Sequence, residues 1–162
     1  MPYAPILATL GYVFAPDRKR VLLVHRVGRA GDAHFGKYNG LGGKLEPHED
    51  VVAGMRREIR EEAQIECDEL HLAGTVSWPG FGPRGEDWFG FLFRITRFTG
   101  TPAATNPEGT LHWIDIHRVA ELPLWDGDRH FLPMIFDPAM PRFHGVMPYS
   151  EGKPVSWSFT SG

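Results

Sequence analysis

The sequence contains a single cysteine, Cys67, among its 162 residues. It therefore cannot form an intramolecular disulfide or a multi-cysteine zinc site. It also lacks an apolar run near the roughly 18 residues that a membrane-spanning helix needs. Residues 1–14 lack the basic segment and the cleavage site of a signal peptide. We therefore expect a reducing, cytoplasmic location and no membrane partner.

Positive charge is not in excess either. The 17 Lys and Arg residues stand against 20 Asp and Glu residues, which gives a net charge of −3 at pH 7. A protein that holds DNA or RNA over a broad face usually carries a basic surface, so no stable nucleic-acid partner is expected, whereas a small anionic substrate is compatible. The oligomeric state is not indicated.

Features of covalent or zinc chemistry are also missing. No GxSxG nucleophile motif occurs, and the eight histidines do not have the spacing of zinc ligands. Cys67 lies between Glu66 and Asp68, whose charges would raise the pKa of its thiol. These absences argue against a covalent intermediate.

Glycine and proline are abundant, with 19 and 14 residues, which favours strands joined by turns over a helical bundle. We predict a single mixed α/β domain over residues 1–162. Expected strands cover 6–15, 21–27, 70–78, 88–98 and 110–116, with a closing pair at 142–147 and 155–159 around Glu151-Gly152. Expected helices cover 50–64 and 126–136.

The helix at 50–64 has the clearest pattern. Val52, Met55, Ile59 and Ala63 recur at helical spacing and predict an apolar stripe that faces a sheet. The segment 39–43 just before it is glycine-dense, and we expect no regular element there.

Three acids, Glu58, Glu61 and Glu62, occupy positions i, i+3 and i+4 of this helix and project from one flank. Like charges at this spacing repel one another, so a cation is expected beside them. Carboxylate oxygens are the ligands that Mg²⁺ or Mn²⁺ prefers. Taken alone, the same acids could form an ordinary solvated helix face. Residues 43–69 hold nine acids and four bases, a local charge of −5.

The spacing of these acids resembles the Nudix box, GX5EX7REUXEEXGU, in which U is a bulky aliphatic residue. The matching residues are Gly43, Glu49, Arg57, Glu58, Ile59, Glu61, Glu62 and Ile65. The final glycine of the pattern is replaced by Gln64. A glycine there would ease the end of the helix through a positive φ, so the departure affects the local turn more than the chemistry.

This resemblance implies a Nudix fold, an α/β/α sandwich with a mixed central sheet, and hydrolysis of a nucleoside diphosphate linked to another group. It implies divalent metal ligands, which are Glu58, Glu61 and Glu62, together with the carbonyl oxygen of Gly42 or Gly43. It also implies that Arg57 pairs with Glu49 and orients the helix. Glu108, from a later turn, is a candidate metal ligand and general base, with Glu61 as the competing base.

Segments 37–44, 122–128 and 142–145 are similar to the Nudix branch that hydrolyses 8-oxo-dGTP to the monophosphate and pyrophosphate. The implied base contacts are Asn39, Trp125 and either Asp126 or Asp128. Further implied substrate contacts are Thr9, Arg26, Gly42, Gly43 and Lys44. The loop 28–36 offers His34 or Phe35 as another wall of the pocket.

Each of these residues also has an ordinary structural alternative. Trp125 could be a core aromatic, and Asp126 could cap the following helix. The activity could also involve another diphosphate, such as an RNA 5′ end, a nucleotide sugar or a dinucleoside polyphosphate. A nucleotide-binding module without catalysis is the remaining alternative, which the intact set of carboxylates disfavours.

Overall fold

Ten strands form one mixed sheet in the computed structural model, which describes residues 1–162. Along the sheet the order is β12-β9-β5-β6-β1-β2-β8-β7, and β3 and β4 add to β2 and β1. Only the β1–β6 and β5–β9 pairs are parallel. The strands of the sheet are β1 (Ile6–Phe14), β2 (Arg20–His25), β3 (Tyr38–Asn39), β4 (Leu41–Lys44), β5 (Glu66–Trp78), β6 (Trp88–Thr99), β7 (Thr105–Asn106), β8 (Gly109–Asp115), β9 (Phe143–Val146) and β12 (Ser158–Ser161).

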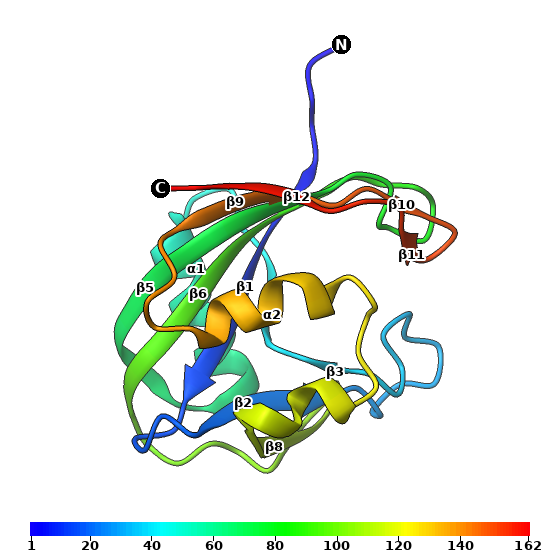
Figure 1. Cartoon of the computed structure of the whole chain (residues 1–162). Coiled ribbons are helices and arrows are strands. Elements are labelled where there is room, and N and C mark those ends of the chain that lie inside the picture. The colour runs from blue at the N-terminus through cyan, green and yellow to red at the C-terminus, as the bar shows by residue number, and fades with distance from the viewer.

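Helices cover both faces of this sheet (Figure 1). Helix α1 (Val51–Ala63) buries Met55 and Ile59 in one core, and α2 (Asp128–Phe136) buries Phe131 and Ile135 in the other, next to the short 3-10 helix η1 (Ile116–Glu121). The predicted α/β/α sandwich with a mixed central sheet is thus confirmed. Neither α1 nor α2 has the length and apolar character of a bilayer-spanning helix.

Helix α1 begins at a capped residue and buries a stripe that differs slightly from the predicted one. The Asp50 side chain accepts a hydrogen bond from the Ala53 N–H at 2.9 Å, which satisfies a free donor of the first turn. Met55, Ile59 and Ala63 are buried as predicted, but Val52 is 39% exposed. Val51, four residues before Met55, packs against the core in its place, because the buried stripe follows the spacing of four.

Gln64 ends α1 in the left-handed region, with φ of 59° and ψ of 36°, and its N–H bonds the Arg60 carbonyl. This is the conformation that the glycine of the Nudix box adopts without strain. A residue with a Cβ pays about 1 kcal/mol to hold it. The helix end is therefore built as the family pattern requires, at a small energetic cost.

We expect Gln64→Gly to raise the free energy of unfolding by about 0.5 kcal/mol, because the relief of strain exceeds the greater chain entropy of glycine. The matched control is Arg56→Gly, at an exposed position inside the helix, which should lower it by about 1 kcal/mol. Urea unfolding measures both. A Gln64→Gly protein less stable than the wild type would contradict this account of the helix end.

Two predictions about regular structure were wrong. Segment 39–43 contributes to β3 and β4, because Gly42 and Gly43 pair closely with β1, where a Cβ at Gly42 would collide with the Thr9 carbonyl oxygen. The closing strand is Ser158–Ser161 instead of 155–159, and it pairs with β9. The turn at Glu151-Gly152 closes a separate small hairpin of β10 (Tyr149–Ser150) and β11 (Lys153–Pro154).

Candidate active site

Helix α1 and strand β4 meet at two glycines that bring the helix carboxylates against the backbone. A Cβ added to Gly43 would lie 2.7 Å from the Glu58 carboxylate. The Gly42 N–H donates a 3.1 Å hydrogen bond to Oε2 of Glu62. Because neither glycine has a side chain, both acids can approach β4 closely.

The carboxylates at this contact lack enough neighbouring positive charge to balance their own. Burial raises the pKa of Glu62 to about 9, and the charges of Glu108 and Glu58 add to the effect. Burial also raises the pKa of Glu58, with Arg57 opposing the rise. A buried carboxylate facing two others is costly unless a cation compensates it. The donor set thus fits a hard divalent cation.

Arg57 makes the predicted pair with Glu49. Its Nε and Nη2 donate to the two oxygens of Glu49 at 2.8 and 2.6 Å, in a bidentate arrangement. Its Nη1 donates to Glu58 at 3.0 Å and its Nη2 to the Lys44 carbonyl at 3.2 Å. The Arg57 hydrogen bonds lower the pKa of Glu49 to about 2. Arg57 thereby fixes α1 against the loop that precedes it.

Glu61 lies at the open side of the cluster. Its side chain is 59% exposed, and its carboxylate accepts a hydrogen bond from Arg57 at 3.3 Å. In this conformation no three acidic, histidine or cysteine side chains are arranged as a complete set of metal ligands. Glu61 is therefore the helix acid with the most freedom to turn toward a bound ion or a water molecule.

Glu108 joins the cluster from the turn between β7 and β8. The Asn106 side chain accepts from the N–H groups of Glu108 and Gly109 at 2.9 and 3.1 Å, and it donates to the Glu62 carbonyl at 3.0 Å. Asn106 thus ties this turn to α1. Glu108 is close enough to raise the pKa values of both Glu58 and Glu62, as a shared site requires.

Arg26 and Thr9 lie on the acidic side of the site. Arg26 pairs with Asp32 at 2.8 Å and approaches Glu108 at 3.5 Å. The Thr9 side chain is 3% exposed, and its hydroxyl donates to the Gly43 carbonyl at 3.5 Å. Their predicted substrate contacts stay predictions.

Trp125 packs against three other aromatic side chains. We name the group of four, His34, Phe81, Trp125 and Tyr149, the aromatic cluster. The Phe81 ring centroid lies 5.0 Å from that of Trp125 and 4.9 Å from that of Tyr149. The His34 centroid lies 5.3 Å from that of Trp125. Lys37 places its Nζ 4.6 Å from the centre of the Trp125 ring. A planar ligand could stack here once Lys37 moves aside.

A hydrogen bond fixes the edge of Trp125. Its indole N–H donates to Nδ1 of His34 at 2.7 Å, and Nδ2 of Asn39 lies 3.5 Å from the same nitrogen. Burial lowers the pKa of His34 to about 4, so the ring is neutral at pH 7 and can accept. Phe35 is 47% exposed. Of the two alternatives in this loop, His34 is the one that contacts Trp125.

The two candidate aspartates flank Gly127. Asp126 is exposed and does not cap α2, since Gly127 holds the cap position without a side-chain bond. Asp128 is less exposed, and burial raises its pKa to about 7. Both carboxylates act on the Tyr149 hydroxyl. Which of the two contacts a purine stays a prediction.

Three residues of the site were not predicted: Lys37, Phe81 and Tyr149. The 79–85 loop is rich in Gly and Pro, which was the one available signal for Phe81. Lys44, which was predicted, has its Nζ 5.6 Å from the Trp88 ring centre. Lys37 begins the 37–44 segment that resembles the 8-oxo-dGTP branch, but no role was predicted for it. No sequence pattern pointed to Tyr149, because its partners lie far along the chain.

Cys67 is buried and unpaired. Burial, with a smaller contribution from Glu66 and Asp68, raises the pKa of its thiol to about 11. The predicted direction is confirmed, and such a thiol is a poor nucleophile at neutral pH.

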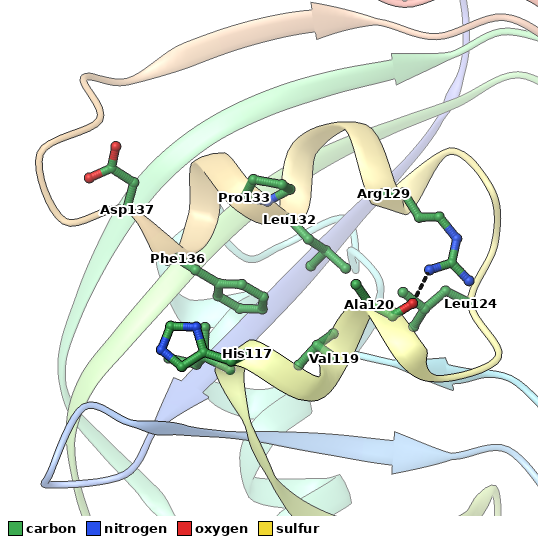
Figure 2. A pocket seen from close by; sticks show the side chains of 10 residues that line it. His117, Val119, Ala120, Leu124, Arg129, Leu132, Pro133, Phe136 and Asp137 are labelled. Carbon is green, nitrogen blue, oxygen red and sulfur yellow. Dashed lines mark hydrogen bonds between the residues drawn. The ribbon is translucent and has the colours of Figure 1, made fainter.

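A separate cavity of about 390 Å³ lies between η1 and α2 (Figure 2). Val119, Leu124, Leu132 and Phe136 give it mainly apolar walls. None of the clustered acids or aromatic-cluster residues lines it.

Comparisons with known proteins agree with this geometry. A family model described as NUDIX domain matches residues 5–135. Proteins named oxidized purine nucleoside triphosphate hydrolase from Danio rerio and Mus musculus are each 31% identical, over 62% of this chain. These matches span 63% of the relatives' own length. The crystal structure of a MutT protein from Bacillus halodurans superposes with a TM-score of 0.81 at 25% identity, covering 95% of this chain and 97% of that one.

Proposed function

The chain belongs to the Nudix family, and we propose that it hydrolyses purine nucleoside triphosphates, preferring an oxidised purine such as 8-oxo-dGTP, to the monophosphate and pyrophosphate. The observation that carries the proposal is the buried Glu62 carboxylate, held against Gly42 and facing Glu58 and Glu108. The names of the two vertebrate relatives support the purine substrate. A cytoplasmic role in cleaning the nucleotide pool belongs to the same proposal.

Mg²⁺, with Mn²⁺ as a substitute, is the proposed cofactor. Glu58, Glu61, Glu62 and Glu108 would hold it, with the carbonyl oxygen of Gly42 or Gly43. When bound, a divalent cation neutralises phosphate oxygens and lowers the pKa of a coordinated water molecule. It would also reverse the negative charge that otherwise repels a triphosphate.

The chain's own residues orient the reactants and move the proton. A water oxygen forms a new bond to phosphorus, the bond from phosphorus to the pyrophosphate oxygen breaks, and the water proton passes to a carboxylate. Glu108 and Glu61 both remain candidates for that base. Glu108 is fixed by Asn106, whereas Glu61 is exposed and free to turn. Arg57 and Glu49 keep α1 in position.

The aromatic cluster is the proposed base site. Trp125 offers a face for stacking, with its edge fixed by His34. The Asn39 amide can donate and accept, and the carboxyl groups of Asp126 and Asp128 can pair with N–H groups of a purine. A site that matches hydrogen-bonding groups of the base discriminates far better than one built from apolar contacts alone.

A product-resolved screen with Mg²⁺ tests the proposed substrate. We expect 8-oxo-dGTP to give the monophosphate and pyrophosphate with a higher kcat/KM than dGTP, UDP-glucose or a capped dinucleotide. Equal or faster hydrolysis of UDP-glucose or the dinucleotide would replace the substrate assignment with a nucleotide sugar or an RNA 5′ end. Nucleotide binding without any turnover would leave the binding module as the function.

A further inference from the structure

Tyr149 reaches the base site from a part of the chain outside the region that the family model matches, residues 5–135. Two backbone hydrogen bonds bring it there: the Met147 N–H donates to the Ser77 carbonyl at 2.8 Å and the Tyr149 N–H to the Pro79 carbonyl at 2.7 Å. The tyrosine is 6% exposed. The C-terminal segment thus supplies one wall of the aromatic cluster.

The hydroxyl of Tyr149 is buried and makes no hydrogen bond of good geometry. The one polar group close enough to act on its oxygen as a donor is the Gly127 N–H, so the hydroxyl proton has no acceptor. It lies directly against Gly127, where an added Cβ would collide with both the hydroxyl and the Met147 sulfur. Burial raises the pKa of Tyr149, and Asp128 and Asp126 add to the rise, while the Gly127 N–H opposes it. A buried hydroxyl whose proton has no acceptor costs stability, so its place against Gly127, within reach of the charges of Asp126 and Asp128, points to a use.

The segment that contacts this hydroxyl, residues 125–128, is also held in place through helix α2, which follows it. Arg129 donates to the Ala120 carbonyl oxygen at 2.5 Å (Figure 2). It also donates to the Leu122 carbonyl oxygen at 3.1 Å, and so fastens α2 to η1. Leu124 adds its side chain to the wall of the cavity between these helices. Arg129 thus fixes the start of α2, and the Tyr149 hydroxyl contacts the same segment at Gly127, between the two aspartates in the sequence.

We propose that Tyr149 is a specificity-determining positioning residue. Its hydroxyl contacts Gly127 and so fixes the position of residues 125–128. When a purine is bound, the hydroxyl donates a hydrogen bond to the Asp126 or Asp128 carboxylate. The inference rests on the proposed base site and deepens it. It assigns the choice between oxidised and normal purines partly to the C-terminal segment. Tyr149 acts through the aspartates and takes no part in phosphate chemistry.

Binding of 8-oxo-dGMP and dGMP, followed by tryptophan fluorescence, tests the inference without turnover. We expect Tyr149→Phe to reduce the ratio of the two affinities about fivefold to tenfold, the effect of one hydrogen bond. Its melting temperature should stay close to that of the wild type, because no hydrogen bond of good geometry is lost. The control Tyr3→Phe deletes an exposed hydroxyl that bonds Ser77, and its affinity ratio should not change.

Gly127→Ala approaches the same contact from the other side, by pushing the segment off the hydroxyl, and should also reduce the ratio. An unchanged ratio in Tyr149→Phe, or equal weakening of both nucleotides, would overturn the inference. A wild type that binds the two nucleotides equally would overturn it as well. Failure of the proposed function has a different signature, namely discrimination in binding with no hydrolysis of any triphosphate.

Discussion

Glu62→Gln is expected to lower kcat/KM for the triphosphate by about 10³-fold or more, while making the cation-free protein more stable. The loss of activity follows from removing a charge at the centre of the proposed cation site, where preorganised charges supply much of catalysis. The gain in stability follows from Gly42. A Gln side chain can still accept its N–H, but it carries no charge to bury against Glu58 and Glu108.

The pH dependence of this gain has a definite sign. Burial raises the pKa of Glu62 from 4.5 to about 9, so the folded protein keeps a proton that the unfolded chain releases between those values. The free energy of unfolding of the cation-free wild type therefore falls as pH rises from about 4.5 to 9. In Glu62→Gln this contribution is absent, so the advantage of the variant grows with pH across the same window.

Urea unfolding in EDTA at pH 5, 7 and 9 measures the effect, with kcat/KM determined in Mg²⁺. Glu121→Gln is the matched control, since Glu121 is 69% exposed and lies outside the acid cluster. That control should change neither quantity. A Glu62→Gln protein that keeps wild-type hydrolysis, or that is less stable than the wild type at pH 9, would remove the basis for a cation site at Glu62.

Arg57→Ala is expected to weaken the apparent affinity for Mg²⁺ and to lower kcat/KM, each by about 10- to 100-fold, the usual effect of losing a residue that orients metal ligands. The substitution removes both bonds to Glu49 and the bond to Glu58. These carboxylates are then left unpaired beside the cluster. Stability should also fall, because a partly buried ion pair is broken on one side.

Two further variants separate orientation from charge. Arg57→Lys keeps the charge but cannot make the bidentate contact with Glu49, so it should restore only part of the loss. Arg60→Ala removes a neighbouring arginine whose partner, Glu66, is exposed, and it should have little effect on either quantity. Equal activities for Arg57→Ala and Arg60→Ala would show that the Glu49 pair does not orient α1.

The parts of the site that could be predicted are those set by local spacing. The acids of α1 share a flank because 3.6 residues make one turn, and Arg57 and Glu49 lie on either side of the same helix start. The β4 strand was missed because its glycines have no propensity of their own. They form a strand only because β1 pairs with them.

The remaining contacts depend on the order of strands in the sheet. Asn106 meets the carbonyl of Glu62 across 44 positions, and Trp125 meets His34 across 91. Tyr149 reaches Phe81 because β9 pairs with β5 in parallel. No local pattern specifies these distances. The local charge of −5 around α1 can be read from the sequence, and the cation that it predicts stays a prediction.

The most direct test of the central claim is hydrolysis of 8-oxo-dGTP by the wild type and Glu61→Gln, with and without Mg²⁺ and with products resolved. Glu61 is exposed, so its replacement should leave folding intact. We predict that the wild type releases the monophosphate and pyrophosphate only with the cation, and that Glu61→Gln loses turnover by orders of magnitude. Hydrolysis that persists in EDTA, or wild-type turnover in Glu61→Gln, would contradict a cation-dependent site on α1.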